Sequence, residues 1–348
     1  MLRYVTEQNP HKPARKFVPV CAAVLAAVAI GGCSNAADEQ PTGAAPAAES
    51  KPTSNNARAG ASGADAGPDL AMLQQWGAQL NAARQASELI DFMDTHIASV
   101  EQETADAMLR DLFTFYRTDL QQLKEAYQRP LVQRVLVDLP LPISEQAMND
   151  IAEEEVRTLL QTTVDGFYKL KAADGVAPMV DYSAFEIYDP YLSPDLQAYI
   201  ALKAMESDNP AASDGTLIVP WDELAMRALA AEAYLKAYPG SEEYDEVKSL
   251  MSLYLSRYIN GSSNTDPFEA GTYRIKNALK SSYMETVAAS PDSIVGTIVA
   301  GYLEVLEASG WQVYEPQSEG TAQNIPEVHE FTQGLDAQLE KLLGSKSK

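Results

Sequence analysis

The sequence has few side chains that could ligate a transition metal or form a nucleophile paired with a histidine base. It contains 2 Cys and 3 His in 348 residues, and Cys21 lies close to the N-terminus within an apolar stretch. No HExxH, GxSxG, GxGxxG or P-loop pattern occurs. The sequence therefore predicts no metal site, no cofactor and no catalytic residue, and the protein is expected not to be an enzyme.

Basic residues are also scarce, because 26 Lys and Arg stand against 49 Asp and Glu and give a formal net charge of -23. The first 32 residues hold four of the basic residues and one acidic residue, so the remainder carries 22 minus 48, or -26. Such a chain lacks the positive surface that binds phosphate backbones, and its field repels anionic lipids. Nucleic-acid binding is therefore excluded as a leading function.

Long apolar runs are confined to the N-terminus. A basic segment over residues 1–16 precedes an apolar stretch over residues 17–30, and no later segment offers the roughly eighteen apolar residues that span a bilayer. The motif Ile30-Gly31-Gly32-Cys33 resembles the lipobox of bacterial lipoproteins, in which one aliphatic and two small residues precede a cysteine that becomes diacylated.

The resemblance implies that residues 1–32 are a signal peptide and that Cys33 carries acyl chains that attach the protein to a membrane. The protein would then face the extracytoplasmic side, on the outer leaflet or on the outer membrane of a cell that has one. An ordinary secretory signal and an uncleaved anchor helix are the alternatives. Because Cys21 would leave with the leader, the mature chain would form no internal disulfide.

Residues 33–68 contain no aromatic and no large aliphatic side chain. A segment of this composition cannot bury enough apolar surface to fold, so it is expected to be a disordered tether with a root-mean-square reach of roughly 30 to 36 Å. The folded body is expected to begin near Asp69.

From Asp69 onward, apolar residues recur at helical spacing and predict an all-α fold of helical hairpins, packed as a bundle or as an irregular α-solenoid. Two helices, one beginning at Asp69 and one behind a capping box of Ser99 and Gln102, are expected to form an αα-hairpin. A helix beginning at Ser144 is expected to include Phe167.

The second half of the chain is expected to hold five more helices, with residues 176–220 irregular apart from one short helix. The predicted helices cover residues 220–238, 242–259, 267–289, 291–308 and 327–343. The ranges 69–172 and 173–348 are an N-terminal and a C-terminal helical region, and the sequence leaves open whether they are separate domains.

Two proline-containing turns, at residues 238–241 and 290–293, start 52 residues apart (290 minus 238) and each lies between two amphipathic segments. The stretch 231–255 resembles the tetratricopeptide-type units of bacterial envelope lipoproteins, where a Tyr-Pro-Gly or Tyr-Pro-Asn turn joins two helices. The offset exceeds the standard period of about 34 residues. The two helix-turn-helix units within 220–309 are thus either a repeat or hairpins of a bundle, with Ser241 expected to cap a helix.

The polar residues are better explained by structure than by chemistry. His96 and His329 have no visible catalytic partner. The loop over residues 208–215, with Asp222 and Glu223 beyond it, has oxygens suited to calcium, but its twelfth EF-hand position would be Trp221. The loop is therefore expected to be a polar connector.

Tyrosine is unusually frequent, with 17 residues against 8 Phe. Tyrosine has an apolar body and a polar tip, which suit it to binding sugars or proteins. The candidate binding surface consists of Tyr182, Tyr188, Tyr191, Tyr199 and Trp221. The competing interpretation places these residues at helix–helix contacts.

Two functions follow from these patterns. The first is a lipid-anchored extracytoplasmic scaffold that engages a protein or peptide partner. The alternative is a ligand-binding lipoprotein that captures a small molecule or glycan in a pocket lined by the tyrosines.

Overall fold

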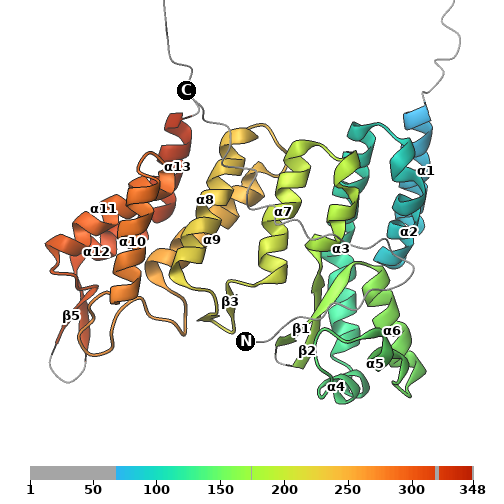
Figure 1. The fold of residues 1–348 in the computed structure, drawn as a ribbon, viewed down its shortest axis with the longest axis horizontal. Helices are drawn as coiled ribbons and strands as arrows, with labels where there is room; N and C mark the ends of the chain where they lie inside the picture. The colour runs from blue at the N-terminus through green and yellow to red at the C-terminus, as the bar shows by residue number, and fades with distance from the viewer. Residues whose placement is uncertain (1–67, 174, 318–320, 347–348) are drawn as a thin grey trace, which may run out of the picture. The chain divides into compact units, whose positions relative to one another are not determined.

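The computed structural model of the protein describes residues 68–173, 175–317 and 321–346. The predicted signal peptide, Cys33 and the tether up to residue 67 lie outside these residues. Helices dominate the described part of the chain, and its strands form only two-stranded sheets, so the all-α fold class is confirmed (Figure 1). None of the described helices is both long enough and apolar enough to cross a bilayer.

Three helices at the start of the described chain pack on one another around buried apolar side chains: α1 (Pro68–Ala82), α2 (Ala86–His96) and α3 (Gln102–Tyr127). The helix expected from Asp69 is therefore divided, because the chain leaves helical geometry at residues 83–85. The capping box at Ser99 was a wrong prediction. The Ser99 hydroxyl donates to the His96 carbonyl in a 3-10 turn, η2 (Ile97–Ser99), and Glu101 occupies the N-cap of α3.

Three shorter helices follow: α4 (Pro130–Leu136), α5 (Glu145–Asn149) and α6 (Glu154–Asp165). Ser144 caps α5 as predicted, with its Oγ accepting from the Ala147 N–H at 3.1 Å. The helix expected from Ser144 is divided, because the chain leaves helical geometry at residues 150–153. Its second part, α6, does not reach Phe167, because Gly166 is the C-cap of α6 and Phe167 adopts a φ of 55°. This left-handed residue turns the chain into a strand.

A β-hairpin that the sequence analysis did not predict joins the two expected regions. It consists of β1 (Tyr168–Ala173) and β2 (Gly175–Val180), which pair antiparallel with Tyr168 opposite Val180. The predicted boundary between residues 172 and 173 falls inside β1. The described residues belong to a single compact unit.

The segment expected to be irregular is more ordered than predicted. It contains a 3-10 helix, η3 (Tyr182–Tyr191), a long helix, α7 (Pro194–Asp208), and the short paired strands β3 (Ala212–Ser213) and β4 (Thr216–Leu217). Proline at the first helical position sets the start of α7, and Ser193 occupies the N-cap without a capping hydrogen bond from its side chain. At 15 residues, α7 is not the short helix that was expected.

The two predicted helix-turn-helix units are present as the pairs α8 (Trp221–Ala237) with α9 (Tyr244–Asn260) and α10 (Asn277–Ala289) with α11 (Ile294–Ala308). Ser241 does not cap α9, because its Oγ lies 3.0 Å from the Tyr234 hydroxyl, which donates to it. The helix expected from residue 267 starts ten residues later, since Phe268 and Ile275 form a β-bridge before it.

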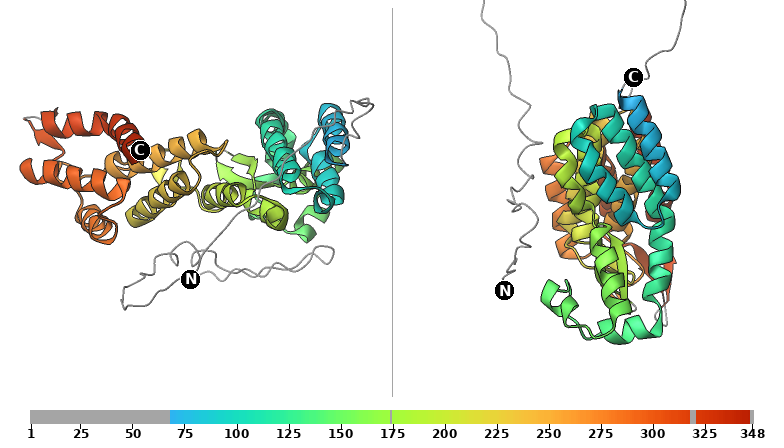
Figure 2. Two further views of the ribbon diagram at one scale, coloured as in Figure 1. Left: turned by 90° about the horizontal axis from the view of Figure 1, so that it is seen from above. Right: turned by 90° about the vertical axis from the view of Figure 1, so that its right-hand side faces the viewer.

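The chain closes with a small hairpin, β5 (Tyr314–Pro316) and β6 (Ala322–Asn324), and two helices, α12 (Pro326–Gln333) and α13 (Leu335–Lys346). In Figure 2 these helices, in red, lie next to the orange pair α10 and α11. Contacts of α11 with α8 and of α13 with α9 join the hairpins into an irregular stack.

Candidate functional site

The tyrosines of the candidate binding surface lie largely in the core. Tyr188 is 2% exposed and Tyr199 is 3% exposed, while Tyr182, Tyr191 and Trp221 are half-buried and pack against the same core. The Tyr188 hydroxyl donates to Asp94 at 2.7 Å, so its polar tip already has a partner.

Aromatic contacts explain why this segment folds inward. The Phe113 ring of α3 lies 5.6 Å from Tyr182, 5.1 Å from Phe185 and 6.0 Å from Tyr199, measured between ring centroids. Lys203 covers the outer side, with its Nζ 5.0 Å from the centre of the Tyr182 ring. The segment therefore attaches η3 and α7 to α3, which agrees with the competing interpretation of these residues.

One carboxylate in this segment is poorly accommodated. The Oδ1 atom of Asp189 is enclosed and has no hydrogen-bond partner, although its backbone carbonyl accepts from Gln197 and Leu192. Burial, with a smaller contribution from the charge of Glu186, raises the pKa of Asp189 to about 6. The side chain therefore opposes folding when it is ionised.

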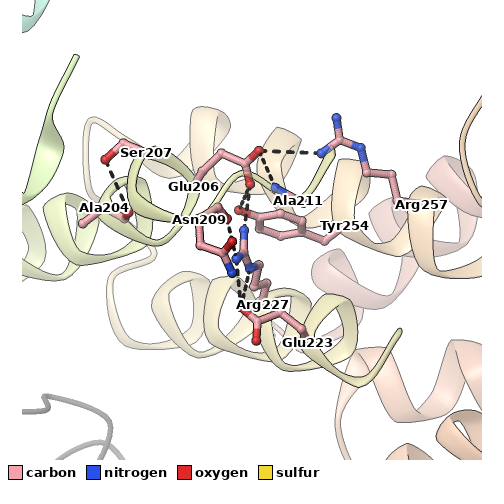
Figure 3. Close-up of polar contacts among 9 residues, drawn as sticks. All are labelled: Ala204, Glu206, Ser207, Asn209, Ala211, Glu223, Arg227, Tyr254 and Arg257. Carbon is pink, nitrogen blue, oxygen red and sulfur yellow. Dashed lines mark hydrogen bonds and ion pairs between the residues drawn. The ribbon is translucent and has the colours of Figure 1, made fainter. Parts of the chain in front are cut away.

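The described region also contains a buried charge network around Arg227 of α8. Arg227 is fully buried, and its guanidinium donates to Glu206 at 2.9 Å, to Glu223 at 2.8 Å and to the Asn209 carbonyl at 2.7 Å (Figure 3). Burial lowers the pKa of Arg227, but hydrogen bonding to Glu223 and nearby negative charge raise it by more, so the charge is retained.

Glu206 of α7 gathers the remaining contacts of the network. It accepts a hydrogen bond from the Tyr254 hydroxyl at 3.1 Å and from the Ala211 N–H at 3.2 Å, and Arg257 approaches it to 3.8 Å. Figure 3 shows these groups converging on one carboxylate from α9 and from the strand-bearing loop. The network therefore fixes α7, α8 and α9 relative to one another.

The loop considered for calcium uses its oxygens within the protein. The Asp208 carboxylate accepts from Lys169 and Ser183, the Asn209 carbonyl accepts from Arg227, and Glu223 pairs with the same guanidinium. Within residues 68–173, 175–317 and 321–346, no cluster of three or more His, Cys, Asp or Glu side chains is placed to hold a metal ion.

A second acidic side chain of α8 is also turned inward. Glu232 is 2% exposed and accepts from the N–H groups of Ile294 at 2.7 Å and Val295 at 3.0 Å, so it satisfies the first turn of α11. Arg227 and Glu232 are thus buried in α8, whereas Asp222 and Lys236 at its two ends are exposed, and Lys236 pairs with Glu232. Met226 is 48% exposed, and Ala230, Ala233 and Ala237 continue the same stripe at helical spacing.

The neighbouring helix α10 also buries two polar side chains and exposes a methionine. Its Ser282 and Thr286 are buried and contact the Tyr258 hydroxyl at 2.7 and 3.0 Å, whereas Met284 is 55% exposed. Since α8 and α10 are in contact, two adjacent helices expose methionine where a surface helix ordinarily exposes charge. We call Met226, Ala230, Ala233, Ala237 and Met284 the methionine–alanine surface. The sequence analysis did not predict this surface, because the polar side chains of these two helices were expected to face water.

Comparison with known proteins supplies no functional assignment. No protein-family model, no curated protein and no solved structure matches the chain. The function of the methionine–alanine surface is therefore inferred from its side chains alone. Thioether side chains suit adaptable contacts with a protein.

Replacing Arg227 by Ala should lower the free energy of unfolding by about 3 kcal/mol, because it leaves Glu206 and Glu223 without their buried counter-charge. Urea denaturation followed by circular dichroism measures the change. Lys248→Ala is the control, since it removes only solvent-accessible ion pairs with Asp245 and Glu340 and should cost less than about 1 kcal/mol. Equal losses in the two variants would contradict the role assigned to the network.

Replacing Asp189 by Asn should stabilise the protein by about 1 to 2 kcal/mol above pH 6. The raised pKa means that the native state binds the proton more tightly than the unfolded state, so stability is lost as pH rises from about 4 to 6. The gain should therefore vanish near pH 4. Urea denaturation between pH 4 and 8 tests this, with Asp222→Asn at an exposed position as the control. A gain that does not change with pH would refute the explanation.

Proposed function

We propose that the protein is a lipid-anchored extracytoplasmic scaffold that holds a protein partner through the methionine–alanine surface of α8 and α10. The supporting observation is that α8 buries Arg227 and Glu232 while its Met226 is half-exposed. A helix that served only to cover the core would place these residues the other way round.

The partner should present apolar side chains flanked by Lys or Arg. Alanines allow a partner backbone to approach closely, and flexible methionines adapt to its side chains. The chain beyond residue 32 carries -26, so a basic partner is attracted and an acidic one is repelled. Attachment through Cys33 and a tether over residues 33–68 would hold this surface near the membrane while leaving it free to turn.

The alternative of a ligand pocket lined by tyrosines receives less support. Tyr188 and Tyr199 are almost fully buried, and the Tyr188 hydroxyl is bonded to Asp94. A ligand could reach them only after η3 and α7 separated from α3.

Lipid attachment can be tested on the two cysteines of the chain. Expressed with its leader in bacteria fed an alkyne-bearing palmitate, the wild-type protein should be labelled and recovered with membranes. Cys33→Ser should lose both the label and the membrane association, whereas Cys21→Ser should keep both, because Cys21 lies in the predicted leader. Labelling that survives the loss of Cys33 would rule out the proposed anchor.

The proposed partner surface can be tested by placing a photoreactive amino acid at position 226 or 284 in the native envelope. Both positions should crosslink to one common protein, whereas position 164, an exposed valine on α6, should not. With that protein purified, Met226→Asp should weaken binding by about tenfold or more, and Val164→Asp should leave it unchanged. Crosslinking that is as strong from position 164 would contradict the assignment.

A further inference from the structure

A cleft of about 320 Å³ lies in the N-terminal part of the described chain, away from the surface proposed for a partner. Residues of α2, α3, α6 and β1 line it, and α2 contacts α3 and α6 while α6 contacts β1. Leu123, Ala126 and Leu159 supply an apolar wall, while Asp119 and Tyr168 supply polar groups. This volume lies at the lower end of the range found for small-molecule sites.

Asp119 is the unusual member of the lining. It is 9% exposed, and no basic side chain forms an ion pair with it within the described residues. Its Oδ2 atom accepts from the Tyr168 hydroxyl at 2.6 Å and from the Ala86 N–H, at the start of α2, at 3.3 Å. Through these two hydrogen bonds, Oδ2 connects α3 to the start of α2 and to β1.

The other oxygen of the Asp119 carboxylate, Oδ1, is available to a ligand in the cleft. Oδ1 accepts no hydrogen bond from the described residues. Oδ1 is also not fully buried. The fully buried side-chain atoms that lack a hydrogen-bond partner in the described chain belong to Asp189, Ser193, Arg257 and Tyr302, and Oδ1 of Asp119 is not one of them. A carboxylate oxygen that lines a cleft and lacks a protein donor is a ready acceptor for a donor brought by a ligand.

The electrostatics favour a cation at this oxygen. Burial raises the pKa of Asp119 although hydrogen bonds from Tyr168 and Ala86 lower it, which shows that the carboxylate is under-compensated. A positive ligand group would supply the missing counter-charge. The second carboxylate of the lining, Glu155, already has a counter-charge, because it is paired with Arg129. The basic residue of the lining, Arg84, is exposed and forms no ion pair with Asp119 within the described residues.

We propose that this cleft binds a small molecule bearing a primary ammonium group on an apolar stem, with the ammonium donating to Oδ1 of Asp119. The stem would lie along Leu123, Ala126 and Leu159. This site does not depend on the proposed scaffold function, because none of its residues belongs to the methionine–alanine surface.

The test measures binding of 2-phenylethylamine to the purified protein by isothermal titration calorimetry at pH 7.5, with 2-phenylethanol as the uncharged analogue of similar shape. The amine should bind saturably, and the alcohol should bind about ten- to a hundredfold more weakly, since it cannot form a charge-assisted bond. Asp119→Asn should remove this preference while keeping an oxygen that can accept from Tyr168.

A second variant keeps the test decisive if Asp119→Asn does not fold. Thr158 lines the cleft from an exposed position on α6, so Thr158→Trp should fill the cleft and abolish amine binding without touching the carboxylate. Thr297→Trp, on α11, is the matched control and should bind like wild type. The proposal is overturned if the amine does not bind at about 10 mM, if the alcohol binds equally well, or if Thr158→Trp binds normally.

Discussion

The buried guanidinium of Arg227 is the constraint on which the arrangement of α7, α8 and α9 depends. A charge without contact to water requires neutralising partners at hydrogen-bond distance, and Glu206, Asn209 and Glu223 supply them from α7, its following loop and α8. The helices cannot slide past one another without leaving a charge unpaired. The same requirement holds Arg227 inside the protein, while Met226 next to it in sequence is half-exposed.

Helix-forming residues and turn chemistry made the helical part of the fold predictable. The pair α8 and α9 lies within a few residues of its predicted bounds, because proline and glycine at 239 and 240 interrupt the helical pattern locally. The hairpin of β1 and β2 was missed although Asp174 and Gly175 are a typical hairpin pair, since residues 168–173 are too few to separate a strand from a helix end. Its register depends on contacts with α3 that lie far away in sequence.

The candidate sites were harder to predict than the helices, because their character depends on which way a side chain points. Tyrosine composition drew attention to residues 182–199, yet Phe113, some seventy residues earlier, is what turns these rings inward. Arg227 and Met226 are neighbours in sequence and have opposite exposures. The charge of Arg227 argues for exposure, and two of the partners that allow its burial, Glu206 and the Asn209 carbonyl, come from another helix and a loop. Asp119 likewise gains its character from Ala86 and Tyr168, which are distant along the chain.

The packing of the last two helices determines where the stack of hairpins ends. A row of helical hairpins leaves the apolar face of its final member open unless an end element covers it. Here Val328, Leu335 and Leu339 of α12 and α13 are buried, and Lys248 of α9 pairs with Glu340 of α13 at 2.9 Å. An apolar face left open at one end of such a row is available for head-to-tail contact with another copy, which builds rings or filaments. The packing of α12 and α13 over this face therefore removes it from contact with another copy of the chain.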